Sequence, residues 1–271
     1  MLTDISLGQY YPGNSFIHKL DPRTKILSSL AYIIAVFLAA ESISYAAVIG
    51  FLFVVIAFSR LPFILVLKSI KPLWIIILLT LWIHVFTGQG EVLWSWKYLI
   101  ITKEGLAMGI KMSLRLILLL MISSILTFTT SPIVLTDGIE AILKPFKKIG
   151  VPAHELAMMM TIALRFIPTL LEETDRIMKA QSARGADFTS GNIVRRAKNM
   201  LPILVPLFIS AFRRADELAV AMEARCYRGG EGRTRMHELV YQQRDMMAAC
   251  GVAALLAAMV ILKWGGFLCA I

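Results

Sequence analysis

Long apolar runs with few or no charges are the feature that most restricts how this 271-residue chain folds. They occupy residues 26–40, 43–58, 73–87, 105–129 and 246–262. Apolar residues make up 58% of the chain, whereas soluble domains hold about 45–50%. Runs of this length and composition are typical of membrane-spanning helices. We therefore predict an all-α, polytopic membrane protein with about five transmembrane helices.

The first two runs are each shorter than the ~20 residues that a straight span prefers. Glu41 and Ser42 separate them. One span across both runs would bury the Glu41 carboxylate in the bilayer, which is energetically expensive. We therefore predict two short spans that are joined by a tight turn and extended by flanking residues.

Charge is concentrated in residues 131–245, which hold 17 of the 28 Lys and Arg residues and 13 of the 18 Asp and Glu residues. This stretch has a helical pattern but is too charged to span a bilayer. The sequence predicts four parts. They are an N-terminal cytoplasmic segment (1–25), transmembrane helices 1–4 (26–130), a cytoplasmic helical segment (131–245), and transmembrane helix 5 with the C-terminus (246–271).

The formal net charge of +10 indicates membrane topology rather than nucleic-acid binding, because Lys and Arg collect on the cytoplasmic side of membrane proteins. The loop at residues 60–71 is basic, whereas the turn at Glu41 is not. With the basic loop inside, the N-terminus and residues 131–245 are cytoplasmic and the C-terminus lies outside. Residues 88–104 are then expected to form a mixed loop outside the cell.

Cysteine and histidine usage gives no sign of a metal site or a disulfide framework. The three cysteines form no CxxC motif and the four histidines are isolated, whereas zinc sites need three or four clustered ligands. The chain has no HExxH, GxSxG or GxxxxGK[ST] motif either. We therefore expect no catalysis, no ATP binding by this chain and no cofactor.

A self-contained secondary transporter or channel is the alternative function. Such proteins place ionisable groups deep in their spans as ion sites. Only Arg115 and His84 come near that description. Both also fit a position at the membrane interface or in interhelical packing.

Two long amphipathic helices are predicted within residues 131–245, one over 155–185 and one from about 204 to 228. In the first, apolar or small residues recur at spacings of four and three, which forms one stripe along the helix. Each helix carries an arginine at its C-terminal end, in Ala183-Arg184-Gly185 and in Ala224-Arg225-Cys226. Either these arginines complement the helix ends and face solvent, or they dock into acidic grooves of soluble partners.

The stretch from Gly8 to Lys25, GQYYPGNSFIHKLDPRTK, resembles the opening signature of the CbiQ-like transmembrane T component of energy-coupling factor (ECF) transporters. That family also has two Ala-Arg-Gly motifs on its coupling helices. The first matches Ala183-Arg184-Gly185. The second matches Ala224-Arg225, but Cys226 stands where the motif has Gly. Since Gly alone is free at positive φ, this departure bears on the local backbone.

The resemblance covers nearly the whole chain and implies a non-catalytic coupling subunit in the plasma membrane of a prokaryote. Its partners would be two cytoplasmic ABC-type ATPases and a substrate-binding membrane S component, which chooses the imported vitamin or metal ion. The tips at Arg184 and Arg225 would each lodge in a groove of one ATPase. Closure of the ATPase pair would then move the coupling helices and reorient the S component.

The apolar faces of residues 132–182 and 201–222 allow two interpretations. They pack against each other, or they form a hydrophobic platform for the S component. Methionine repacks easily and suits a surface that accepts several partners. The methionines that mark this platform are Met158, Met159, Met160 and Met178.

Overall fold

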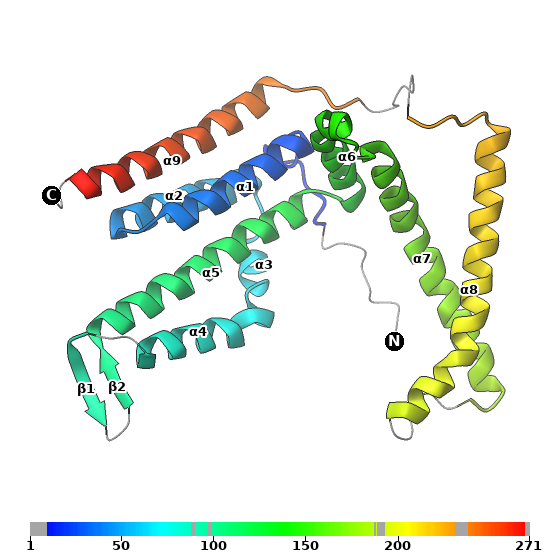
Figure 1. The fold of residues 1–271 in the computed structure, drawn as a ribbon, viewed down its shortest axis with the longest axis horizontal. Coiled ribbons are helices and arrows are strands. Elements are labelled where there is room, and N and C mark those ends of the chain that lie inside the picture. The colour runs from blue at the N-terminus through cyan, green and yellow to red at the C-terminus, as the bar shows by residue number, and fades with distance from the viewer. Residues whose placement is uncertain are drawn as a thin grey trace. The chain divides into compact units, whose positions relative to one another are not determined.

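The computed structural model describes residues 10–87, 90–96, 99–186, 188, 193–230 and 238–268. The chain divides into two compact units. One, the bundle unit, comprises Gly8–Gly138 and Leu239–Ile271, and the other, the α7–α8 unit, contains Ile139–Glu238. Both consist almost entirely of helices (Figure 1), which confirms the predicted all-α class.

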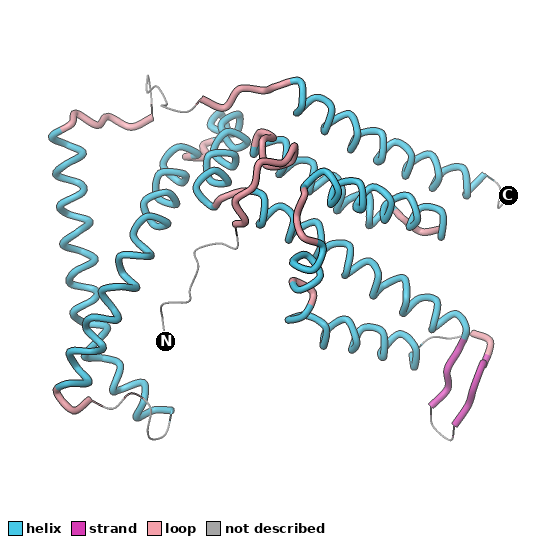
Figure 2. Tube along the Cα trace, turned by 180° about the vertical axis from the view of Figure 1, so that it is seen from behind, coloured by secondary structure: helices cyan, strands magenta, loops and turns pink. Residues whose placement is uncertain are grey.

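Both units are built from helices joined by loops of different lengths, with one short two-stranded segment (Figure 2). Those of the bundle unit are α1 (Pro22–Leu38), α2 (Ser42–Ser59), α3 (Phe63–Lys68), η1 (Lys71–Leu73), α4 (Trp74–Thr87), α5 (Lys103–Thr129) and α9 (Gln243–Leu268). Helix α6 (Pro132–Leu143) begins in the bundle unit and ends in the other. The α7–α8 unit continues with η2 (Lys144–Ile149), α7 (Ala153–Ala183) and α8 (Ile193–Ala224).

Helix α1 begins before the apolar run of residues 26–40, at a cap made by Asp21. A carboxylate oxygen of Asp21 accepts a hydrogen bond of 2.9 Å from the backbone N–H of Arg23. Pro22 occupies the first helical position, where its missing N–H costs nothing because that group has no partner inside the helix.

A polar network joins the start of α1 to the end of α5 and the start of α9. The Lys25 ammonium donates to the carbonyl oxygen of Thr129 at 2.9 Å and to the Thr130 hydroxyl at 3.3 Å. The Asp245 carboxylate accepts from the backbone N–H of Asp21 at 2.8 Å. These bonds explain why a membrane protein carries several charges in residues 10–25. They fasten the N-terminal segment to two helices that are distant in the sequence.

The core of the bundle unit lies between α1, α2, α5 and α9. Tyr32 is almost completely buried, and its hydroxyl donates to the carbonyl oxygen of Val48 at 3.2 Å. This bond matters because a hydroxyl buried in an apolar core needs a partner. The other buried side chains include Val36, Leu52, Leu118, Ile122 and Met259.

Helix α4 packs closely on the first half of α5 through two glycines one turn apart. A Cβ added to Gly105 would lie 2.9 Å from the carbonyl oxygen of His84, and one added to Gly109 would lie 3.2 Å from that of Leu81. Small residues at this spacing let two helix backbones approach each other in a membrane.

Within the described residues, five helical stretches are long and apolar enough to cross a membrane: Ser42–Ser59, Phe63–Thr87, Lys103–Thr129, Ala153–Ala183 and Gln243–Lys263. Their number agrees with the prediction, and four coincide with predicted spans. The predicted span over residues 73–87 begins ten residues earlier, at Phe63, because α3, η1 and α4 continue through Pro72.

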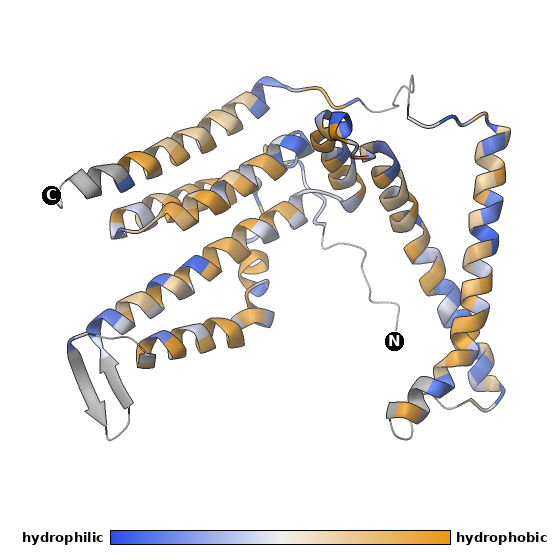
Figure 3. Cartoon of the chain, in the orientation of Figure 1, coloured by the Kyte–Doolittle hydropathy of each residue, from blue (hydrophilic) through white to orange (hydrophobic). Residues whose placement is uncertain are grey.

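The stretch Ala153–Ala183 differs from the prediction. Helix α1, the predicted first span, has only 17 residues, whereas α7 meets the length and composition of a span. The second half of α7 is strongly charged, however, with Glu172, Glu173, Asp175, Arg176 and Lys179. Figure 3 shows this contrast: α4 is apolar along most of its length, whereas hydrophilic and hydrophobic residues alternate along α7 and α8. That many charges in two turns are unsuited to the interior of a bilayer.

The predicted mixed loop at 88–104 contains an antiparallel hairpin of β1 (Val92–Trp96) and β2 (Leu99–Thr102). Ser95 pairs with Ile100, and Trp96 pairs with Leu99. Strand β1 contains Val and Trp and β2 contains Ile and Thr, all of which favour extended structure. Trp94 and Trp96 lie on β1.

Candidate functional site

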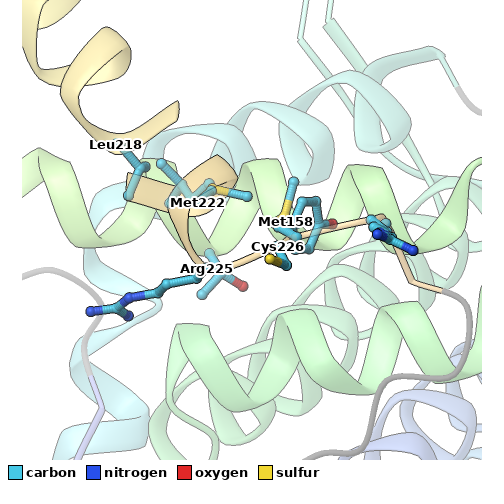
Figure 4. A pocket seen from close by; sticks show the side chains of 10 residues that line it. Met158, Leu218, Met222, Arg225 and Cys226 are labelled. Atoms are coloured by element: carbon cyan, nitrogen blue, oxygen red, sulfur yellow. The ribbon is translucent and has the colours of Figure 1, made fainter. Parts of the chain in front are cut away.

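The two arginine-bearing helices form an antiparallel pair. Helix α7 has 31 residues and α8 has 32, so they are about 46 and 48 Å long. Met158 near the start of α7 and Met222 near the end of α8 line the same cavity of about 660 Å³ (Figure 4). The C-terminal ends of the two helices therefore point in opposite directions.

An ion pair joins the two helices midway between those ends. The Glu173 carboxylate of α7 accepts from the Ser210 hydroxyl at 2.7 Å and from the Arg214 guanidinium of α8 at 2.7 Å. The Ser210 hydroxyl, followed by Arg214, lowers the pKa of the Glu173 carboxyl, because both donate to its ionised form. We call Glu173, Ser210 and Arg214 the joint.

The joint is equally distant from the two terminal arginines. Arg184 lies 11 residues after Glu173, and Arg225 lies 11 residues after Arg214. At 1.5 Å per residue each arginine is about 16 Å of helix away from the ion pair. The segment of α7 between the joint and Arg184 is therefore as long as the segment of α8 between the joint and Arg225.

The first tip, Ala183 to Gly185, ends α7 in a Schellman motif. Arg184 is the C-cap residue, and Gly185 has a left-handed φ of 88°. The backbone N–H of Gly185 donates to the carbonyl oxygen of Ser182 at 3.0 Å. The N–H of Ala186 donates to that of Gln181, also at 3.0 Å. These two bonds satisfy carbonyl groups that would otherwise have no partner at the helix end.

The second tip, Ala224 to Cys226, has the same bonds. The N–H of Cys226 donates to the carbonyl oxygen of Glu223 at 2.8 Å, and the N–H of Tyr227 donates to that of Met222 at 3.0 Å. Cys226 adopts a left-handed φ of 56°. The replacement of Gly by Cys therefore leaves the cap unchanged, and Arg225 occupies the same position as Arg184.

Both terminal arginines are exposed. In the described part of the chain, neither has a carboxylate oxygen within 4 Å. The Arg225 guanidinium extends away from Met158 and Cys226 (Figure 4). Both charged groups are therefore available to a partner.

Three side chains anchor the backbone after the second tip to the start of α7. They are Glu140, His154 and Tyr227, and we call them the clamp. His154 lies 3.2 Å from the Tyr227 hydroxyl through Nε2 and 3.1 Å from a Glu140 carboxylate oxygen through Nδ1. Gly230 lies against the same imidazole, where an added Cβ would be 2.5 Å from the ring. Tyr227 is also the last residue of the Schellman motif, so the clamp holds the cap that presents Arg225.

The apolar faces of α7 and α8 are only partly used in packing. Met158 and Met178 are half-buried, whereas Met159 and Met160 are 55% and 41% exposed. A second exposed face lies on α8, where Phe208 and Phe212 stack with ring centroids 6.5 Å apart. The exposed face of α8 consists of Leu201, Val205, Phe208 and Phe212.

Comparison with known proteins identifies the family. A family model described as CbiQ, cobalt transport protein, matches residues 13–237. The energy-coupling factor transporter transmembrane protein EcfT of Acidaminococcus fermentans is 70% identical over 265 residues, which cover 98% of this chain and 99% of that protein. The chain belongs to the EcfT family.

Other EcfT proteins align over similar lengths. The protein of Clostridium kluyveri is 55% identical over 269 residues, 98% of this chain and 100% of its own length. The protein of Bacillus subtilis is 47% identical over 264 residues, 97% and 100% of the two chains. The chain is therefore a membrane component of an energy-coupling factor transporter, and the family predicted from its motifs is confirmed.

The two Ala-Arg motifs of this EcfT family member end the two long helices, as the sequence predicts. The clamp was not predicted, because His154 and Glu140 are isolated in sequence and only the fold brings them to Tyr227. Phe208 and Phe212 lie within the apolar face that the sequence indicates over residues 201–222, and their spacing of four residues places them on one helix face. The first two residues of the opening signature, Gly8 and Gln9, lie outside the described residues.

Among the residues that the structure describes, no three His, Cys, Asp or Glu side chains come together as a metal site. Cys226 and Cys250 are both free thiols. The chemistry of the two tips is that of two exposed guanidinium groups at the ends of long helices.

Proposed function

We propose that this chain joins two ABC-type ATPases to a substrate-binding S component, and that Arg184 and Arg225 each dock in a groove of one ATPase. The observation that carries this proposal is the matching Schellman cap at both helix ends. Two arginines with the same backbone setting suit two similar partner surfaces. Such a pair of sites fits two homologous ATPase subunits.

The chemistry of the tips supports docking into an acidic groove. A guanidinium group stays charged and binds a carboxylate through two parallel hydrogen bonds. Ala183 and Ala224 flank the arginines with minimal side chains, so a partner surface can approach the helix ends closely. In this proposal the N-terminus and residues 131–245 lie in the cytoplasm, where ATP is available.

The exposed apolar residues support the second half of the proposal. The exposed face of α8 and the methionines Met159 and Met160 would form the platform for the S component. An exposed apolar face such as that of α8 marks a protein or membrane contact. The S component would choose the vitamin or metal ion that is imported, so the substrate depends on the partner.

The joint explains how motion would pass from the ATPases to the platform. Closure of the ATPase pair on ATP binding would displace both tips. Because each tip lies about 16 Å from the joint, rigid helices would transmit the displacement to the faces on either side of it. Movement of packed helices against one another is a common form of transmission.

The test is assembly of the complex. We expect the double variant Arg184→Glu/Arg225→Glu to lose the ATPases on affinity purification from its host, because each new carboxylate repels an acidic groove. Circular dichroism and gel filtration should show that the membrane protein itself remains folded. The matched control is Arg176→Glu/Arg213→Glu, which reverses two exposed charges on the same helices away from the tips.

An intact and transport-competent complex from the tip variant would contradict the docking role. Substrate uptake by the purified chain alone in liposomes would support the alternative, a self-contained secondary transporter. Loss of the ATPases from the control variant as well would show that general charge, rather than the tips, determines assembly.

A further inference from the structure

Two cations lie one turn apart within the apolar helix α5, outside the α7–α8 unit. The Lys111 ammonium donates to the carbonyl oxygen of Ala40, and the Arg115 guanidinium donates to that of Ala39, both at 3.3 Å. Ala39 is the C-cap residue of α1. The pair therefore occupies the C-terminal end of α1, whose last carbonyl groups have no partners inside the helix.

Among the described residues, no carboxylate balances the positive charge at this point. Neither cation has a carboxylate oxygen within 4 Å among the described residues. Glu41 is exposed in the adjoining turn and makes no ion pair there. The end of a helix supplies only about half of one negative charge, whereas Lys111 and Arg115 carry two positive charges.

Arg115 also retains an unused donor, although another nitrogen of its guanidinium lies 3.7 Å from the Met112 sulfur. Its Nε is buried without a hydrogen-bond partner, and its guanidinium lies 5.4 Å from the centre of the Phe37 ring. An uncompensated cation is costly inside a membrane protein unless an anion or water reaches it. The geometry therefore calls for an anion beside the turn between α1 and α2.

The lengths of these helices indicate where that anion comes from. With 17 and 18 residues, α1 and α2 are about 26 and 27 Å long, less than the ~30 Å of the hydrocarbon core. Bilayers become thinner around short spans, so lipid headgroups would come close to the turn. Phe37 and Ile43 on either side of it are 59% and 66% exposed and apolar, which suits contact with acyl chains.

We propose that Lys111 and Arg115 bind the phosphate of an anionic phospholipid at the turn between α1 and α2. Arg115 supplies a fork of donors that matches phosphate oxygens, and Lys111 adds a second charge. Bound lipid would fasten the bundle unit to one leaflet at the place where two short spans meet. This site is independent of the tips and of the ATPases.

The experiment measures lipid retention by the purified full-length chain. Phosphatidylglycerol is titrated in detergent, and bound lipids are counted by native mass spectrometry. We expect Lys111→Gln/Arg115→Gln to bind one phosphatidylglycerol fewer, or that lipid about 30-fold more weakly, since each basic residue contributes about fivefold to anionic-lipid binding. Diacylglycerol, which has the same acyl chains but no phosphate, should bind equally to both proteins.

Two further variants separate lipid binding from loss of folding. Lys111→Arg/Arg115→Lys keeps both charges and should retain the lipid, whereas Lys263→Gln removes a cation from α9 and should leave this binding unchanged. Equal phosphatidylglycerol binding by wild type and Lys111→Gln/Arg115→Gln would overturn the proposal. Displacement of the lipid by millimolar inorganic phosphate would overturn its lipid component and assign the site to free anions. Loss of the lipid from the charge-preserving variant would overturn the role of charge.

Discussion

The two tips have the same backbone conformation, but different contacts stabilise it. At the first tip nothing lies within 4 Å of a Cβ placed on Gly185, and glycine reaches its left-handed conformation without strain. At the second tip Cys226 adopts that conformation with a side chain, and the clamp fastens the next residue to α7. The direction of each arginine is therefore determined by hydrogen bonds of the cap, whereas the residue at positive φ and its anchor can vary.

The largest expected effect concerns whether the tips are equivalent in function. We expect Arg184→Glu and Arg225→Glu, made separately, each to weaken ATPase binding by about 30-fold or more, because reversing a buried interfacial charge costs 2 kcal/mol or more. Each single change should weaken assembly less than both together. Titration of purified ATPases against the reconstituted chain measures this. A single variant as defective as the double variant would break the equivalence.

Exchanging the residue at positive φ, Cys for Gly at one tip and Gly for Cys at the other, should change the stability of the two helix ends in opposite directions. We expect Cys226→Gly to stabilise the end of α8 by about 1 kcal/mol and Gly185→Cys to destabilise the end of α7 by a similar amount, because a side chain in the left-handed region costs about that much. Hydrogen exchange of the last-turn amides is the measurement. Cys250→Gly, within helix α9, is the control and should lower stability instead. An unchanged exchange rate in both tip variants would show that the cap is not under this strain.

The clamp should affect the second tip alone. We expect Tyr227→Phe to remove one hydrogen bond to His154, a loss of about 1 kcal/mol, and to speed hydrogen exchange in residues 225–230. Exchange in residues 184–186 should stay the same. Tyr241→Phe, an exposed tyrosine in the bundle unit, is the control. Faster exchange at both tips would mean that they are coupled through the length of the helices.

The smallest effect concerns the joint, which the two tips share. The pKa of Glu173 is below its ordinary value, so its bond to Arg214 stabilises the pair fully above the ordinary pKa and is lost as the pH falls through the lowered one. Because the ion pair is partly exposed, we expect only a few tenths of a kcal/mol. Spin-label distances between α7 and α8, measured against pH, should change in the wild type and not in Glu173→Gln. A pH response that persists in Glu173→Gln would assign it to another group.

Much of this organisation could be predicted from local sequence signals. Asp21 and Pro22 mark the start of α1, and Arg184 with Gly185 marks the end of α7. Because a helix cap depends on residues within one turn, it can be predicted from the sequence without knowledge of the fold. The strands around Trp94 were missed because two short strands between apolar helices produce little periodicity.

The sequence by itself determined the membrane class, the family, and the presence of two helices that end in arginine. These properties depend on composition, on apolar runs and on short motifs, all of which are local along the chain. Only the tertiary structure decided that Glu173 meets Arg214 midway between the tips, that His154 reaches Tyr227, and that Lys111 and Arg115 meet the end of α1. Those contacts join residues 41 to 76 positions apart, and their free energy depends on the antiparallel packing of whole helices, which no local pattern specifies.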